Sequence, residues 1–225
     1  MMRWWFALAA VLPVCAQTKT MTQGPHRMEI MLERRDGGAW RSVDPGLVFA
    51  QDDRVRFRFR TNFDGYLYVM NQSTSGKYEQ LFPREETGRD NRIRAGRDYL
   101  VPATQAAFRI TGPPGHEVVY WMITPAALTE ERPEYKPLPP PPPQELPKTL
   151  MPRCDDAMFR ARGECIDTSA GPKLVPRGDA LPDNLAGVEK DKRELTIMRE
   201  KNTSVLASPV PLTGPVIYVF RLAHR

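Results

Sequence analysis

A regular alternation of strand-like and turn-like segments over residues 26–128 is the feature that most limits the fold of this chain. Runs rich in β-branched and aromatic residues are separated about every 8–12 residues by Gly, Pro, Asp, Asn and Ser, and no helical period appears. The expected strands are His26–Arg34, Arg54–Thr61, Tyr66–Gln72, Tyr78–Phe82, Ala106–Thr111 and Glu117–Thr124. This spacing predicts an all-β fold, a β-sandwich of immunoglobulin-like type.

The segment Arg54–Gln72 has the clearest pattern and predicts an antiparallel hairpin. Three apolar residues alternate with four arginines along its first strand, so this strand has one apolar face and one charged face. A three-residue loop, Phe63-Asp64-Gly65, pairs Phe59 with Val69 and keeps the apolar residues together, with Gly65 in the left-handed conformation. A two-residue loop would instead turn apolar residues of the second strand onto the charged face.

The charged face of this hairpin is the candidate binding surface. The predicted pairing brings four arginines and two tyrosines together on it: Arg54, Arg56, Arg58, Arg60, Tyr66 and Tyr68. Guanidinium groups stack on phenol rings and bind carboxylate or phosphate, so this surface suits an anionic polymer or an acidic partner. The alternative is a solvated outer face whose charge is offset by Glu and Asp on a neighbouring strand.

A proline-rich segment follows these strands. Residues 132–152 contain nine prolines, five of them in the run Pro139–Pro143, which predicts a stiff polyproline II spacer. Such a run is also a ligand for aromatic grooves. Asn184–Lys201 is a helix candidate, and Val216–Leu222 is the strongest β run in the chain. Because a lone strand cannot bury itself, we expect this last strand to return to the sheet.

These segments define the expected domain organisation. Residues 17–131 and 213–225 form the sandwich, and residues 132–212 form an insertion before the last strand. The insertion combines a Pro-rich linker, a loop closed by a disulfide and a short helix.

Cysteine spacing predicts the disulfide. Removal of a leader that contains Cys15 leaves Cys154 and Cys165, with ten residues between them. An even pair in an exported chain is typical of a disulfide. A metal site needs more ligands nearby, and the three histidines are far away in sequence, so we expect neither a metal nor a cofactor.

Residues 1–16 have the pattern of a signal peptide. A short basic start precedes the uncharged stretch Trp4–Val14, and Val14-Cys15-Ala16 is a small-residue cleavage pattern before Gln17. The uncharged stretch would span roughly 16 Å as a helix, about half a bilayer core, which is too short for a transmembrane anchor. We therefore expect export to the periplasm or the cell exterior. A lipidated Cys15 and a buried N-terminal helix are the alternatives.

Several motifs, taken in their order along the chain, resemble one bacterial family. They are Asp53–Phe57, Thr61–Val69, Leu81–Pro83, Asp90–Gly96, Tyr99–Pro102 and Gly112–Gly115. Over roughly residues 47–125 the chain is similar to the family called domain of unknown function 4384. The resemblance implies a small β domain found on exported proteins and attached to larger envelope or signalling proteins. The family brings no established activity, so the resemblance implies no catalytic residue.

No catalytic motif emerges from the residues themselves. A calcium-loop template around Asp64 fails at both ends, where Arg60 and Asn71 replace acidic ligands. There is no Gly-x-Ser-x-Gly, and the sequence places no Ser, His and acid together. The neighbouring carboxylates of Asp155-Asp156 are expected to lie in a solvated loop.

The sequence thus predicts an exported, non-enzymatic binding or assembly module of the bacterial cell envelope. One alternative is a binder of anionic envelope glycan that uses the arginine and tyrosine face, and another is an enzyme of unrecognised type. The expected partner is an unknown protein or an anionic envelope polymer. We expect neither nucleic-acid binding nor a transmembrane segment.

Overall fold

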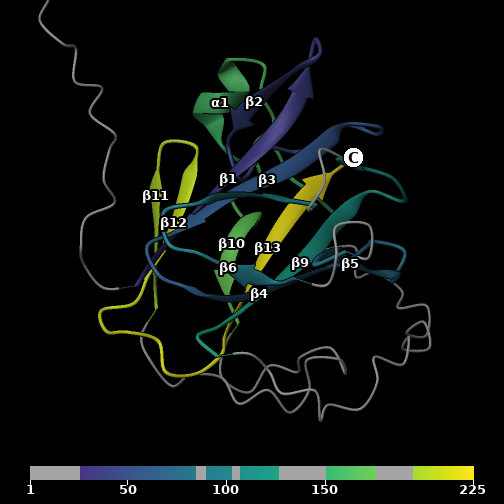
Figure 1. Cartoon of the computed structure of the whole chain (residues 1–225). Helices are drawn as coiled ribbons and strands as arrows, with labels where there is room; N and C mark the ends of the chain where they lie inside the picture. The colour runs from purple at the N-terminus through teal and green to yellow at the C-terminus, as the bar shows by residue number, and fades with distance from the viewer. Residues whose placement is uncertain (1–25, 85–89, 103–106, 127–150, 176–194) are drawn as a thin grey trace, which may run out of the picture.

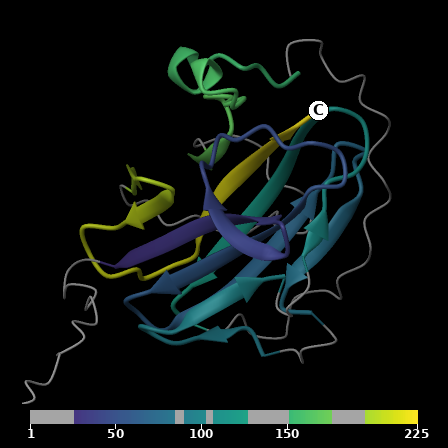
Figure 2. The same cartoon turned by 90° about the horizontal axis from the view of Figure 1, so that it is seen from above.

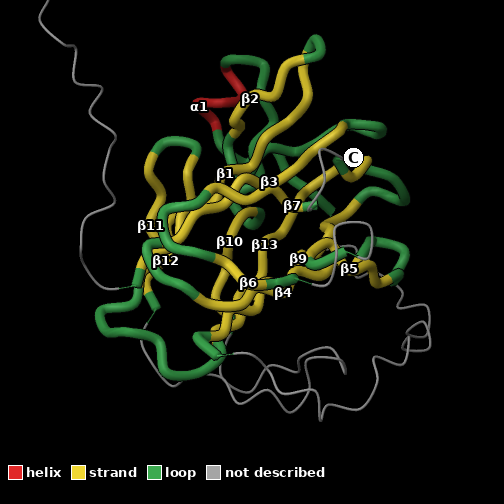
Figure 3. The backbone as a smooth tube through the Cα atoms, viewed as in Figure 1, coloured by secondary structure: helices red, strands yellow, loops and turns green. Residues whose placement is uncertain are grey.

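The computed structural model describes residues 26–84, 90–102, 107–126, 151–175 and 195–225 (Figure 1). The predicted signal peptide, the proline run and residues 184–194 of the helix candidate lie outside the described residues. In the part of the chain that the structure describes, no helix is long and apolar enough to cross a membrane. Strands dominate these residues, and the helix α1 is short (Figure 3).

The first sheet has seven strands, in the order β11-β12-β1-β3-β7, with β2 also paired to β1 and β8 to β3. Its strands are β1 (Arg27–Asp36), β2 (Ala39–Val43), β3 (Arg54–Thr61), β7 (Asp98–Val101), β8 (Phe108–Arg109), β11 (Thr196–Glu200) and β12 (Thr203–Ala207). All of these pairings are antiparallel.

The second sheet has six strands, in the order β10-β13-β9-β4-β5, with β6 also paired to β4. Its strands are β4 (Gly65–Gln72), β5 (Tyr78–Phe82), β6 (Arg92–Ile93), β9 (Gly115–Thr124), β10 (Gly171–Leu174) and β13 (Val216–His224). The two sheets pack face to face over one apolar core, which confirms the predicted all-β sandwich.

Aromatic side chains from both sheets meet in this core. Phe57 of β3 contacts Trp121 of β9 edge-to-face, with ring centroids 5.3 Å apart, and Phe220 of β13 at 5.0 Å. Trp121 also stacks on Tyr218 at 5.9 Å. All four side chains are fully buried. The alternation along β3 therefore points its apolar residues inward, as the sequence predicts.

The predicted hairpin of residues 54–72 is wrong. β3 pairs with β1, β7 and β8, whereas β4 pairs with β5, β6 and β9 in the other sheet. Residues 62–64 carry the chain across the sandwich. The apolar faces of β3 and β4 meet across the core rather than side by side, and alternation is equally compatible with both arrangements.

Gly65 has a different role from the one predicted. It is not among the glycines with positive φ, so it does not occupy the left-handed position of a hairpin loop. A Cβ atom at this position would lie 2.8 Å from the carbonyl oxygen of Thr124. The glycine is therefore required by the close approach of β4 to the end of β9.

The prediction that the last strand returns to the sandwich is confirmed. β13 pairs with β9 along its whole length, from Val216 opposite Ile123 to His224 opposite Gly115. Strands β10, β11 and β12 come from the segment that the sequence predicts to be an insertion. β10 pairs with β13, β12 pairs with β1, and β11 pairs with β12, so the sandwich extends into that segment.

The helix predicted over residues 184–201 is wrong where the structure describes it, because Thr196–Glu200 form the strand β11. This segment hydrogen bonds to β12, and Ile197 lies opposite Leu206 beside the core. Pairing with β12 thus outweighs the weak helical pattern of this segment. The described helix is instead α1 (Ala157–Ala161), in the loop that extends from one end of the sandwich (Figures 1 and 2). Asp156 caps it by accepting the N–H groups of Met158 and Phe159.

Candidate functional site

The four predicted arginines lie on the outer face of β3, but their guanidinium groups differ in exposure. Val55, Phe57 and Phe59 point into the core, so the alternating Arg54, Arg56, Arg58 and Arg60 point outward. Arg54 is exposed, Arg58 and Arg60 are half-buried, and Arg56 is buried. The four arginines therefore do not form an evenly exposed row.

Glu33 of β1 holds the two central arginines. It lies opposite Arg56, whose Nε donates to Glu33 Oε2 at 2.6 Å, and Arg58 Nε donates to Glu33 Oε1 at 3.1 Å. The side chains of Arg56 and Glu33 are only 9% and 8% exposed. The indole of Trp40 covers the Arg56 guanidinium, with 4.1 Å between the ring centroid and Cζ. Arg56 is thus committed to a partner inside the protein.

Other acidic side chains continue the pairing across this outer face. Asp98 Oδ2 lies 4.0 Å from Arg58, and Arg27 pairs with Glu29 at 3.2 Å and with Glu200 at 3.0 Å. Within the described part of the chain, Arg54 and Arg60 make no ion pair. We call this surface the paired face: Arg27, Glu29, Glu33, Trp40, Arg54, Arg56, Arg58, Arg60, Asp98 and Glu200. Most of its charge is offset by neighbouring strands, as the solvated alternative predicts.

The two predicted tyrosines lie on the other sheet. Tyr66 and Tyr68 alternate with the buried Leu67 and Val69 on β4, so they point outward from the six-stranded sheet. The structure therefore does not bring them beside the arginines. The predicted site divides into two halves on opposite sides of the sandwich.

Tyr66 and Tyr68 belong to a larger surface on the six-stranded sheet, which is bordered by two cations, Arg92 opposite Tyr66 and Lys173 opposite Val219. The register of β4, β5, β9 and β13 places the following side chains on it, which we call the tyrosine face: Tyr66, Tyr68, Met70, Gln72, Tyr78, Val118, Tyr120, Met122, Ile217, Val219 and Arg221. Nine of them are half-buried, and Met122 and Ile217 are buried.

The centre of the tyrosine face is a second apolar cluster, separate from the core. Met122 and Ile217 are covered by Tyr68, Met70 and Tyr120, among others. The hydroxyl of Tyr120 donates to Gln72 Oε1 at 3.2 Å. Burial and the nearby Tyr78 raise the pKa of Tyr120 to about 12, against a lowering effect of Arg221. The Tyr120 phenol therefore remains a neutral hydrogen-bonding group.

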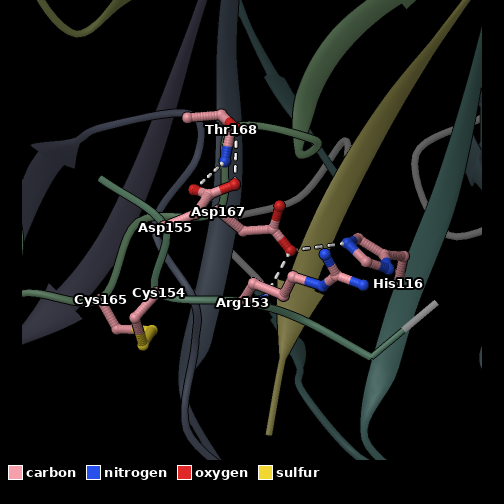
Figure 4. Close-up of a disulfide and its surroundings, with 7 residues drawn as sticks. All are labelled: His116, Arg153, Cys154, Asp155, Cys165, Asp167 and Thr168. Atoms are coloured by element: carbon pink, nitrogen blue, oxygen red, sulfur yellow. Dashed lines mark hydrogen bonds and ion pairs between the residues drawn. A yellow bond between two sulfur atoms is a disulfide. The ribbon is translucent and has the colours of Figure 1, made fainter. Parts of the chain in front are cut away.

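The predicted disulfide between Cys154 and Cys165 is present, in a loop that hydrogen bonds to Gly46 and Val48 (Figure 4). Asp167 fastens the loop to the sheet, because its Oδ2 accepts the N–H of Arg153 at 3.0 Å and lies 3.2 Å from His116 Nε2. Asp155 accepts both the N–H and the hydroxyl of Thr168. Those hydrogen bonds lower the pKa of Asp155.

The same loop brings a serine, a histidine and an aspartate together, which sequence reasoning missed. Ser169 Oγ donates to Asp167 at 2.6 Å and lies 3.4 Å from His116 Nε2. A catalytic triad needs the acid and the hydroxyl on opposite ring nitrogens, whereas here both contact Nε2. Burial raises the pKa of Asp167, but hydrogen bonds from Ser169 and Arg153 outweigh this effect and lower it. In this arrangement the grouping anchors the loop to β9.

Three buried polar side chains, those of Asn71, Glu117 and His224, form a cluster near the start of β9. Glu117 accepts the amide of Asn71 at 2.6 Å, and its Oε1 lies 3.7 Å from His224 Nε2. Burial raises the pKa of Glu117, and burial together with the charge of His116 lowers the pKa of His224. Protonation of His224 is therefore disfavoured in the folded chain.

The described residues define the chain as a β-sandwich module with two unlike outer faces. Within it, residues 48–127 match the model of the family described as Domain of unknown function (DUF4384). This match is to the family that the ordered motifs predict. The match contains β3 of the paired face and β4 and β9 of the tyrosine face, whereas Glu33, Trp40 and β13 lie outside it. No curated protein and no solved structure matches the chain.

Proposed function

We propose that this chain is an exported binding or assembly module of the bacterial cell envelope, without enzymatic activity of its own, and that it contacts a partner protein through the tyrosine face. The observation that carries the proposal is the composition of that face. It offers half-buried tyrosines around an apolar centre, with Arg221 among its members and with Arg92 and Lys173 at its border.

Such a surface has the chemistry of a protein interface. Contiguous apolar patches on a folded module often mark interaction sites, and tyrosine is enriched in interface centres because it adds apolar area and a hydrogen-bonding tip. None of the helices and strands that the structure describes packs on this face. Export is supported by the leader pattern of residues 1–16 and by the disulfide, which is typical of oxidising compartments.

A photo-crosslinking amino acid in place of Tyr68 tests the proposal in envelope extract. We expect crosslinks to a defined protein, and we expect pull-down of that protein to fail with the double variant Tyr66→Ala and Tyr68→Ala. The matched control is Arg35→Ala with Arg54→Ala, two exposed residues of the other sheet. If the control loses the partner and the tyrosine variant keeps it, the tyrosine face is not the contact surface.

Binding of an anionic envelope polymer remains a second candidate, because Arg54 and Arg60 make no ion pair in the described part of the chain. If these two arginines bind glycan, the amount of glycan that the protein retains should fall as the salt concentration rises. The reason is that exposed charges are screened beyond about 10 Å at 0.1 M salt. Retention that is lost in Arg54→Gln and kept in the tyrosine variant would favour this candidate over a protein partner.

A further inference from the structure

A tight turn between β6 and β7 carries two exposed arginines, Arg94 and Arg97. The N–H of Arg97 donates to the carbonyl of Arg94 at 3.3 Å, which makes these residues the first and last of a β-turn. Their Cα atoms therefore lie within about 7 Å of each other. Gly96, the third residue of the turn, has a φ of 75°, which a residue with a side chain rarely adopts. The glycine thus allows the chain to place both arginines on one turn.

Three hydrogen bonds fasten this turn to the end of the sandwich. The N–H of Gly96 donates to the last carbonyl of β3 at 2.7 Å, and the N–H of Ala95 donates to Asp64 Oδ1 at 2.8 Å. The N–H of Arg94 donates to the hydroxyl of Tyr99 at 2.8 Å. All four backbone N–H groups of the turn are therefore used inside the protein. Its guanidinium groups start from a fixed base and are the donors that remain for a ligand.

Arg60 of β3 adds a third guanidinium group at this turn. Its Nη2 lies 3.9 Å from the position that a Cβ atom would take at Gly96. Its Nε is buried without a hydrogen-bond acceptor in the described chain, so the protein leaves this cation incompletely satisfied. The guanidinium of Arg97 lies over the ring of Tyr99, with 5.6 Å between Cζ and the ring centroid. Two guanidinium groups are thus placed at the turn, and Arg94 supplies a third from the turn itself.

The carboxylates near the turn have other partners. Asp64 accepts a backbone N–H of the turn, and Asp98, which lies opposite Arg60 in the strand register, is 4.0 Å from another arginine of β3. Within the described part of the chain, Arg60, Arg94 and Arg97 make no ion pair. Three guanidinium groups without an internal carboxylate therefore meet at one place on the surface.

A phosphate monoester matches this arrangement better than a carboxylate does. One arginine satisfies a carboxylate through two parallel hydrogen bonds, whereas a phosphate monoester carries roughly −1.5 to −2 charges and three acceptor oxygens. Several guanidinium groups can therefore share one phosphate.

We infer that Arg60, Arg94 and Arg97 form a binding site for a phosphate monoester, which is carried by a lipid headgroup or is free inorganic phosphate. None of the three arginines belongs to the tyrosine face, so the site goes beyond the proposed protein contact and does not depend on it.

Titration with inorganic phosphate at constant ionic strength, followed by NMR of the guanidinium Nε–H groups, tests the site. The double variant Arg94→Gln with Arg97→Gln should fold, because both side chains are exposed. We expect its dissociation constant for phosphate to rise at least about tenfold, because two charge-assisted donors are lost. The control, Arg35→Gln with Arg54→Gln, removes the same charge from exposed positions of β1 and β3. It should change the constant less than about twofold, since distant exposed charges are screened.

A lysine variant separates guanidinium recognition from attraction by charge alone. Arg94→Lys with Arg97→Lys keeps the charge and loses the planar fork, so we expect several-fold weaker phosphate binding. Affinity equal to that of the natural chain would contradict the site. An equal loss of affinity in the glutamine variant and in its control would contradict it as well, and so would acetate that binds as tightly as phosphate.

Vesicles distinguish the two sources of phosphate. Co-sedimentation of the natural chain with phosphatidylcholine vesicles that contain phosphatidic acid, lost in the Arg94→Gln with Arg97→Gln variant, would assign the site to a lipid headgroup. A response to inorganic phosphate alone would assign it to free phosphate, and binding to neither would overturn the inference. The variant Tyr66→Ala with Tyr68→Ala should keep phosphate binding, so a failure of the proposed protein contact and a failure of this site give different results.

Discussion

The two outer faces of this sandwich are built from the same alternation of side chains and have opposite chemistry. On the paired face, Glu33 lies between Arg56 and Arg58, and Trp40 covers one of the guanidinium groups. On the tyrosine face, half-buried phenols surround Met122 and Ile217. The paired face satisfies most of its polar groups internally, whereas the tyrosine face presents half-buried aromatic side chains. A row of charges in a sequence is therefore a poor guide to how many of those charges the fold leaves unpaired.

The largest expected effect tests the core that both faces share. Phe57→Ala should cost roughly 3–5 kcal/mol of unfolding free energy, because it opens a cavity against Trp121 and Phe220. Chemical denaturation measures this value. A loss below about 1 kcal/mol would mean that β3 does not present this side chain to the core, and the assignment of both outer faces would fail.

Arg56→Gln tests whether the paired face is structural. It should cost about 3 kcal/mol, because it leaves the buried Glu33 without its closest cation. Arg54→Gln on the same strand is the control and should cost less than about 0.5 kcal/mol, since this residue is exposed. The double variant Arg56→Gln with Glu33→Gln should recover part of the loss. If both single variants instead lost equally little unfolding free energy, the arginines of β3 would form an unpaired, exposed surface.

Tyr120→Phe tests the tyrosine face with a smaller change. It removes one neutral hydrogen bond, to Gln72, and keeps the ring, so we expect a loss of about 1 kcal/mol in denaturation. Crosslinking at position 68 should persist, because the apolar contact area is unchanged. A loss as large as that of Arg56→Gln would show that the tyrosine face is as structurally committed as the paired face.

The exposed edge of the paired face should give the smallest effect. Arg27→Gln removes pairs with Glu29 and Glu200 whose side chains remain partly exposed. Such pairs contribute under about 1 kcal/mol each. Raising the salt concentration to 1 M should change the unfolding free energy of the natural chain by a similarly small amount, because screening weakens exposed pairs and leaves the buried Arg56–Glu33 pair largely intact.

Local patterns determined several features of this protein. The alternation along residues 54–61 predicts which side chains are inside, and the apolar run after residue 215 predicts a strand that needs a sheet. The cysteine spacing predicts the disulfide, and the ordered motifs predict the DUF4384 domain. Each of these signals is carried by neighbouring residues, so no knowledge of distant contacts is needed.

Only the tertiary structure decided which strands are neighbours. Backbone hydrogen bonds are the same for any partner strand, so alternation cannot tell whether β4 lies beside β3 or across the core from it. The arrangement that buries the apolar faces of both strands places Tyr66 and the arginines in different sheets. It also places Glu33 of β1 opposite Arg56. Residues 118–123 are apolar on both faces, so their outward side is visible only once β9 is placed between β4 and β13. A side chain's direction is a local property, whereas its neighbours are set by the fold as a whole.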